Sequence, residues 1–352
     1  MKNGTNYGDY MVVAKPRPWY PYLASFIIPI SAIIGNLMGG PLAGLTIFIA
    51  LVIFPIADHF SGQSTQPTSP PTNDTPFEII LILHALLNPI TIATLAYHAF
   101  LVGNAPSLWL AGFSTGIACG VSGIVVGHEL GHTKPRSFTW LLARMNLMFA
   151  FYLHFTTEHN YNHHKNVATV KDAASAPPGK GLWLHLLQTV PGQFTSAWKI
   201  EKRRLQKRDK STLFVSNPVF KGLIIESAFI AVVYWFAGIW VAIAILYQAA
   251  ISIFLLEYVN YIRHYGLQRE VNEKQTEMHS WQTLKRLSRW TLFELTLHPA
   301  HHLEASKPFW KLEPYENAPT LPSGYFAIFW PCVFPPLWKR IMAPRLLPTV
   351  TD

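Results

Sequence analysis

Residues 78–101 read EIILILHALLNPITIATLAYHAFL, and Glu78 is the only Asp, Glu, Lys or Arg in this run. A helix needs about 20 apolar residues to cross the roughly 30 Å hydrocarbon layer of a bilayer, so the run predicts a membrane-spanning helix. Five further runs support the same interpretation: Tyr22–Met38, Pro41–Ala57, Ser107–Val126, Lys221–Phe236 and Ile239–Val259. The sequence therefore predicts an all-α integral membrane protein with about six transmembrane helices.

Charge is distributed unevenly along the 352 residues, of which half are apolar and only 13% are Asp, Glu, Lys or Arg. No Lys or Arg occurs between Pro18 and Thr133, which is not expected of a soluble domain. The net charge of +9 could suggest nucleic-acid binding, but the basic residues cluster beside apolar runs, where they are typical of membrane-surface anchors. The largest cluster comprises Lys199, Lys202, Arg203, Arg204, Lys207, Arg208 and Lys210.

The basic residues also predict the orientation of the chain, which we treat as one domain over residues 1–352. If Lys2, Lys15 and Arg17 lie in the cytoplasm, alternation of the spans places segments 127–217 and 260–352 there as well. These two segments carry the histidine clusters and are expected to form a histidine-rich helical cap on the cytoplasmic side.

An apolar stretch within the cap region, Phe138–Phe155, is long enough to suggest a seventh span. It contains Arg144 and is flanked by histidine clusters that must meet in space. We therefore predict a buried cytoplasmic or re-entrant helix at this position.

Histidine is the residue type that points most directly to chemistry. Nine of the fifteen histidines fall in four groups: His128 and His132; His159, His163 and His164; His264; and His298, His301 and His302. Residues three or four apart share a helix face, so the pairs 128/132 and 159/163 can each aim two imidazoles at one point. Nine ligands exceed the coordination sphere of one ion and imply two. All-nitrogen ligation suits iron, copper or zinc.

Carboxylates near these groups could accept the second ring N–H of a ligand histidine and fix its tautomer. The candidates are Glu129, Glu158, Asp172, Glu257 and Asp58, with Glu294 and Glu304 less favoured. The two cysteines, Cys119 and Cys332, lie too far apart in sequence to indicate a disulfide framework or a cysteine-based metal cluster. Six histidines lack partners at helical spacing and are left out of the site: His59, His84, His98, His154, His185 and His279.

Four motifs carry a resemblance to a known family. They are HELGHT at 128–133, EHNYNHH at 158–164, NYIRHYGL at 260–267 and LHPAHH at 297–302. Their sequence, order and spacing resemble those of the membrane alkane 1-monooxygenases.

That resemblance implies two non-haem iron ions held by the nine histidines and hydroxylation of a terminal methyl group, with O₂ as co-substrate and a primary alcohol as product. It also implies a hydrophobic substrate drawn from the bilayer and a location in the bacterial cytoplasmic membrane. Electrons would come from a rubredoxin or a ferredoxin-type donor with its NAD(P)H reductase.

Three residues depart from the family pattern. The family usually has Glu where Arg263 stands and a basic residue where Leu297 stands. Pro299 disfavours helical geometry in the residue before it, which predicts that His298 approaches from an extended segment. The departures bear on the substrate class and on docking of the electron carrier.

The same residues leave other functions open. A xylene-type methyl hydroxylase of alkylarenes shares the histidine groups, and membrane fatty-acyl desaturases or hydroxylases use similar ones. HELGH also matches the H-E-x-x-H zinc-protease motif, which would leave seven clustered histidines unexplained. A metal transporter is expected to place its ligands within the spans, whereas these clusters follow them.

Overall fold

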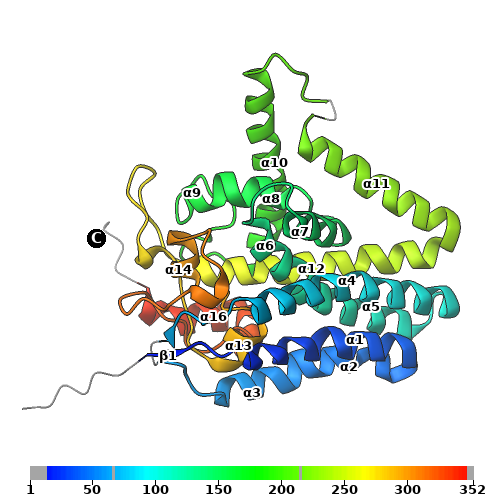
Figure 1. Cartoon of the computed structure of the whole chain (residues 1–352), viewed down its shortest axis with the longest axis horizontal. Helices are drawn as coiled ribbons and strands as arrows, with labels where there is room; N and C mark the ends of the chain where they lie inside the picture. The colour runs from blue at the N-terminus through cyan, green and yellow to red at the C-terminus, as the bar shows by residue number, and fades with distance from the viewer. Residues whose placement is uncertain (1–13, 66–67, 214–215, 347–352) are drawn as a thin grey trace, which may run out of the picture.

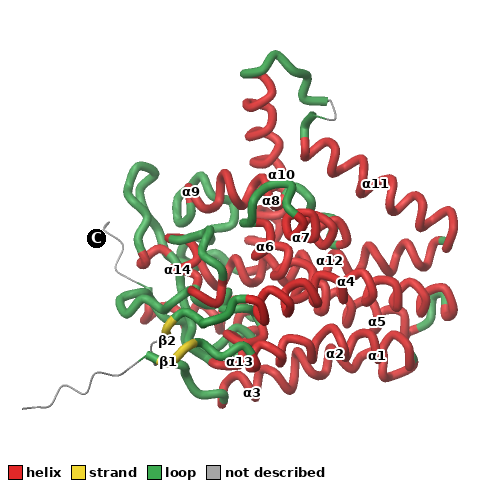
Figure 2. The backbone as a smooth tube through the Cα atoms, viewed as in Figure 1, coloured by secondary structure: helices red, strands yellow, loops and turns green. Residues whose placement is uncertain are grey.

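The computed structural model describes residues 14–65, 68–213 and 216–346, and most of these residues are helical (Figures 1 and 2). Lys2, one of the residues used to predict the orientation, lies outside the described residues. Six helical segments among the described residues have the length and hydropathy of a membrane span, which confirms the six predicted from the sequence. They are Tyr20–Met38, Gly40–Phe60, Thr75–Val102, Pro106–Gly131, Pro218–Ala237 and Ile239–His264.

Three of these segments combine several helical elements, and the other three are single helices. The elements are η1 (Tyr20–Phe26) with α1 (Ile27–Met38); η2 (Gly40–Gly44), α2 (Leu45–Phe48), η3 (Ile49–Ile53) and α3 (Phe54–Phe60); α4 (Thr75–Val102); α5 (Pro106–Ala118), η4 (Cys119–Val125) and α6 (Val126–Gly131); α11 (Pro218–Ala237); and α12 (Ile239–His264).

The remaining elements form the cap and its connections. They are β1 (Lys15–Pro16) paired in parallel with β2 (Thr68–Ser69); α7 (Phe138–Phe149); α8 (Phe155–Glu158), η5 (His159–His163) and α9 (His164–Asn166); α10 (Leu182–Gln206); η6 (Glu277–His279); α13 (Arg286–Thr291); α14 (His298–Leu303); η7 (Phe309–Lys311); α15 (Phe329–Val333); α16 (Pro335–Met342); and η8 (Ala343–Arg345).

Most of the long helices lie side by side, and α12 packs against α4, α5 and η4 (Figure 1). Small residues on α5 allow this close approach. A Cβ placed on Gly116 would lie 2.5 Å from Cβ of Ile251, and one on Gly112 would lie 2.7 Å from Cδ1 of Tyr247. Glycine at such positions lets helix backbones approach closely within a membrane.

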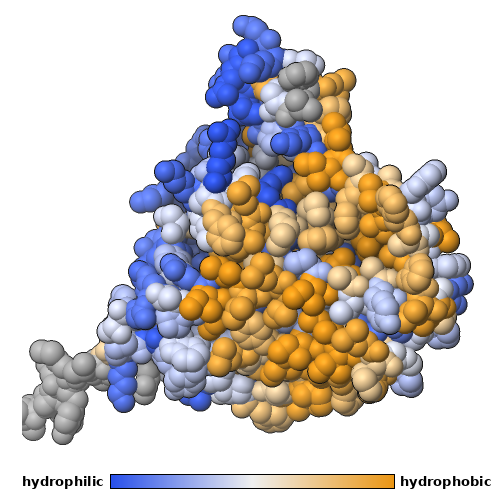
Figure 3. Space-filling view, turned by 45° about the vertical axis from the view of Figure 1, so that its right-hand side comes forward, coloured by the Kyte–Doolittle hydropathy of each residue, from blue (hydrophilic) through white to orange (hydrophobic). Residues whose placement is uncertain are grey.

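The outer surface of these helices is apolar. Trp235 and Phe236 on α11 are 81% and 79% exposed, as is expected of side chains that face lipid and not of a soluble surface. Figure 3 shows apolar residues gathered in a broad area over the long helices, with hydrophilic residues at the top and left margin. The chain is therefore an integral membrane protein.

Two features of the cap differ from a simple reading of hydropathy. The stretch Phe138–Phe155 is not a seventh span, because its helix α7 ends at Phe149 and packs on α6 and α4. The 25-residue helix α10 was not predicted. It projects away from the stacked helices (Figure 1) and carries most of the basic cluster at its C-terminal end.

Arg17, one of the residues used to predict the orientation, makes specific contacts within the protein. Its side chain is only 5% exposed and forms an ion pair with Glu313 over 2.8 Å. It also donates to Oγ1 of Thr68 and to the backbone carbonyl of Phe309. Arg17 therefore joins the N-terminal strand to the cap.

Asp58 was expected beside a ligand histidine, but its described hydrogen bonds go elsewhere. Its buried carboxylate accepts from the backbone N–H and the hydroxyl of Ser288 over 3.1 and 2.8 Å. It also accepts from the backbone N–H groups of Phe326 and Ala327 over 3.2 and 3.3 Å. Asp58 thus attaches the end of α3 to α13 and to the C-terminal segment.

This attachment depends on the absence of a side chain at Gly324. A Cβ there would lie 2.0 Å from Oδ2 of Asp58, whereas a Cβ at Gly44 would meet Leu110 at an ordinary 3.6 Å. We expect Gly324→Ala to reduce stability by about 1–3 kcal/mol, as overpacking typically does, and Gly44→Ala to cost less. The midpoints of thermal unfolding in detergent measure the difference, and equal midpoints would contradict the assigned role of Asp58.

Candidate metal centre

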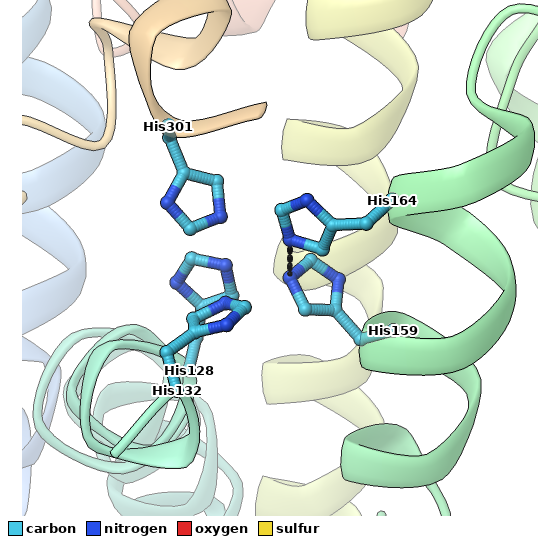
Figure 4. Close-up of side chains that lie close together, drawn as sticks. All are labelled: His128, His132, His159, His164 and His301. Carbon is cyan, nitrogen blue, oxygen red and sulfur yellow. Dashed lines mark hydrogen bonds between the residues drawn. The ribbon is translucent and has the colours of Figure 1, made fainter. Parts of the chain in front are cut away.

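The nine predicted histidines come together as two adjacent groups. One group contains His128, His132, His159, His164 and His301, and the other contains His163, His264, His298 and His302. Within each group, one candidate ligand atom per residue lies within 4.8 Å of all the others. Figure 4 shows the five-histidine group, whose rings point toward one another from three separate segments of the chain.

A π-helical turn decides how the second motif divides between the groups. The sequence predicted that His159 and His163, four residues apart, would aim at the same point. In the structure η5 widens the helix at these residues, so His159 shares a face with His164, five residues on. Their Nε2 atoms lie 3.0 Å apart in the five-histidine group, while His163 belongs to the other group.

The last motif divides in a similar way. The prediction that His298 approaches from an extended segment is wrong, because α14 begins at His298 and holds Pro299 in its first turn, where proline is tolerated. His298 and His302 therefore share a face, with their Nε2 atoms 2.9 Å apart. His301 points into the five-histidine group.

Burial favours the neutral form of six site histidines in the cap. Burial lowers the pKa of His132 to about 4. Burial first and neighbouring charged groups second lower the pKa of other site histidines in the cap well below 6.5: His159, His164, His298, His301 and His302. A neutral imidazole offers one nitrogen lone pair, which is the form that binds a metal.

Several ring nitrogens in these groups are buried and have no described hydrogen-bond partner. They include both nitrogens of His128 and the Nε2 atoms of His132, His163 and His301. Buried polar atoms in proteins are normally paired, so clustered unpaired nitrogens call for a common partner. An all-nitrogen donor set of this kind fits a transition-metal ion, and neither group contains a described carboxylate or thiol.

Asp172 is the one predicted carboxylate that bonds directly to a site histidine among the described residues. Its Oδ2 accepts from Nδ1 of His163 over 3.0 Å, which leaves Nε2 of His163 as the lone-pair nitrogen. Burial lowers the pKa of His163, but attraction to Asp172 outweighs it and the pKa is raised overall. Asp172 is itself held by Ser175 and by the backbone N–H of Ala174.

Glu129 and Glu158, two other predicted carboxylates, make no described hydrogen bond to a site histidine. Glu129 accepts from the backbone N–H of Phe309 over 2.8 Å, and Glu158 accepts from Nδ2 of Asn162 over 2.8 Å. Burial raises the pKa of Glu158 to about 7. The described hydrogen bonds of both side chains therefore position the backbone and neighbouring amides and do not reach a histidine.

Glu257 lies at the centre of a buried polar network. Its carboxylate accepts from Tyr152, Thr189, Gln193 and Asn260 over 2.7–3.2 Å. These bonds join α10 to α12, and none of the described ones goes to a histidine. The two weaker candidates also lie elsewhere. Glu294 is bonded to Arg289 and Tyr22, and Glu304 pairs with Lys307.

The six histidines left out of the prediction also lie outside both groups. His84 is hydrogen-bonded to Ser25 and Ser122, and His98 to Ser107. The hydrogen bonds of His84 and His98 join neighbouring helices, as expected for structural histidines.

An apolar cavity reaches the histidines from within the membrane helices. Its wall includes Leu51 of η3, Val121 of η4 and Leu255 of α12, together with His128 and Arg263. Tyr325 and Phe329 from the C-terminal segment complete it. Sequence reasoning missed this cavity, because its lining comes from stretches far apart in the sequence that meet only in the folded chain.

Known proteins resemble this chain over most of its length. The family model described as fatty acid desaturase matches residues 104–331, which includes all four histidine motifs. The hydroxylase component of the xylene/toluene monooxygenase of Pseudomonas putida is 28% identical over 242 residues, covering 68% of this chain and 62% of that protein.

Alkane 1-monooxygenases match over longer stretches. Alkane 1-monooxygenase 2 of Alcanivorax borkumensis is 31% identical over 350 residues, covering 93% of this chain and 90% of that protein. The alkane 1-monooxygenase of Ectopseudomonas oleovorans is 30% identical over 347 residues, covering 93% and 85%. This chain therefore belongs to the alkane 1-monooxygenase family and is a membrane-bound oxidoreductase.

Proposed function

We propose that this protein hydroxylates the terminal methyl group of an alkane to a primary alcohol, with O₂ as co-substrate and two iron ions held by the histidine groups. The apolar cavity carries the proposal. It lies among the membrane helices, its wall is almost entirely apolar, and His128 lines it. A hydrocarbon dissolved in the bilayer can therefore enter the cavity and present one end to the metal centre.

When bound, the iron ions supply the activation of O₂ and the oxidation of the C–H bond. The protein contributes the surroundings. Neutral imidazoles offer lone pairs from rigid helices, and Asp172 fixes the tautomer of His163 so that Nε2 faces the site. The apolar wall, including Val121, excludes water and orients the chain of the substrate.

The reaction places one oxygen atom in the alcohol and the other in water, so electrons must come from outside. We propose a rubredoxin or a ferredoxin-type donor with its NAD(P)H reductase as the source. The basic end of α10 would attract an acidic carrier by electrostatic steering. The histidine groups and α10 would then face the cytoplasm, and the membrane would be the bacterial cytoplasmic membrane.

The assignment of two metal sites is tested by removing one ligand from each group. We expect His301→Ala and His163→Ala each to lose about half of the bound iron and to abolish hydroxylation. His59→Ala removes an exposed histidine outside both groups and should keep the full iron content. Elemental analysis of the purified proteins measures this. Full loading in both site variants, or zinc in place of iron, would contradict the proposed centre.

The substrate class is tested by product analysis. Cells that express the chain with a rubredoxin and its reductase are given medium-chain alkanes, alkylbenzenes and a fatty-acid ester, and products are separated by gas chromatography. We expect primary alcohols from the alkanes and none from cells with His301→Ala. Benzylic alcohols alone would indicate an alkylarene hydroxylase. Products with new double bonds would indicate a desaturase.

The cavity itself is tested by filling it. Val121 is buried in the wall, and Val121→Phe shortens the space available to the substrate. We expect the ratio of long-chain to short-chain alcohols to fall by about tenfold or more, because one methylene in an apolar pocket is worth about 1–3 kcal/mol. The control is Leu246→Phe on the exposed side of α12. An unchanged chain-length profile at full iron content would place the substrate elsewhere.

A further inference from the structure

Arg263 is a buried cation at the end of α12, with 2% of its surface exposed. Its guanidinium donates to the backbone carbonyl of Val259 over 3.2 Å, to Oδ1 of Asn260 over 2.5 Å and to Nδ1 of His298 over 3.2 Å. No carboxylate among the described residues forms an ion pair with it. No described ion pair therefore accounts for the position of Arg263 against His298.

Buried hydrogen bonds hold Arg263 in this position. Glu257 accepts from Nδ2 of Asn260 over 3.1 Å, so the amide must turn its oxygen toward Arg263. Glu257 is itself bonded to Thr189 and Gln193 of α10. The orientation of the guanidinium is thus fixed from two helices.

The chemistry of the contact determines where the proton of His298 lies. A guanidinium carries only donors and does not deprotonate in proteins, so Nδ1 of His298 must accept. A neutral imidazole then carries its one proton on Nε2. That atom lies 3.0 Å from Nε2 of His264 and 2.9 Å from Nε2 of His302, so it faces the centre of the four-histidine group.

His163 in the same group shows the opposite arrangement. Its Nδ1 donates to the Asp172 carboxylate, so its Nε2 keeps the lone pair that a metal needs. Ligand histidines almost always have such an acceptor on the second nitrogen, and losing it typically changes metal affinity by about 10–100-fold. His298 has a donor where His163 has an acceptor.

We propose that Arg263 withholds His298 from the ligand set, so that the ion in the four-histidine group is held by His163, His264 and His302. This inference rests on the metal centre of the proposed function. Arg263 is a positioning residue because it acts on the ion through the ring of His298. The ion in this group is bound more weakly than it would be by four histidines.

The test exchanges the donor at position 263. Arg263→Gln removes the charge and leaves an amide oxygen, or water in the vacated space, to accept from Nδ1 of His298. Arg263→Lys keeps a cationic donor. We expect Arg263→Gln to bind Fe²⁺ in the four-histidine group about tenfold or more tightly than the natural chain, and Arg263→Lys to bind it with little change.

The measurement is anaerobic Fe²⁺ titration of the full chain in detergent, in competition with a chromophoric chelator. His302→Ala identifies the affected ion, because it removes a ligand of that group alone. This readout needs no turnover, so it does not depend on the substrate or on the electron carrier.

His298→Ala distinguishes an effect of Arg263 on ligation by His298 from simple electrostatic repulsion between Arg263 and the metal ion. In the natural chain it should leave the affinity almost unchanged, whereas in Arg263→Gln it should abolish the gain. A large loss of affinity in His298→Ala alone would overturn the inference, as would a gain in Arg263→Gln that persists without His298. Failure of the natural chain and of Arg263→Gln to bind Fe²⁺ would overturn both the proposed centre and the inference.

Discussion

The structure depends on gathering nine imidazoles, seven of them buried and two half-buried, where the long helices meet the cap. An imidazole removed from water loses its solvent partners, and each ring nitrogen must find another partner or cost free energy. The chain meets this constraint by gathering the rings so that their nitrogens converge on two points. The close packing of α5 against α12 at Gly116 fixes the two spans that lead to His128 and His264.

The parts of the fold that follow from composition could be predicted from the sequence. A run such as residues 78–101 can satisfy its backbone in lipid only as a helix, so hydropathy is sufficient to predict the span. The nine histidines could be named for a similar reason, because few functions other than metal binding explain so many buried imidazoles. The His128 and His132 pair follows directly from helical spacing.

The division of the histidines between the two groups could not be predicted in the same way. Spacing of three or four predicts a shared face only in an α-helix, and the π-helical turn at η5 exchanges His163 for His164. Asp58 shows a related limit. An acidic residue at the end of an apolar run indicates a buried partner, but only the fold shows that the partner is Ser288. Similarly, α10 is amphipathic and too polar for a hydropathy criterion to detect.

The partners of the ring nitrogens show why a ligand set is more than a list of histidines. Asp172 and Arg263 occupy equivalent places, each against Nδ1 of a ring in the same group. Asp172 accepts a hydrogen bond from its ring, whereas Arg263 donates one. Glu257, which the sequence suggested as a direct partner of a histidine, acts instead through Asn260 on Arg263. A donor and an acceptor beside Nδ1 favour opposite tautomers of the ring. Whether the partner of Nδ1 donates or accepts therefore decides which ring nitrogen keeps its lone pair. Two rings with similar burial and similar geometry can therefore differ in whether they bind an ion at all.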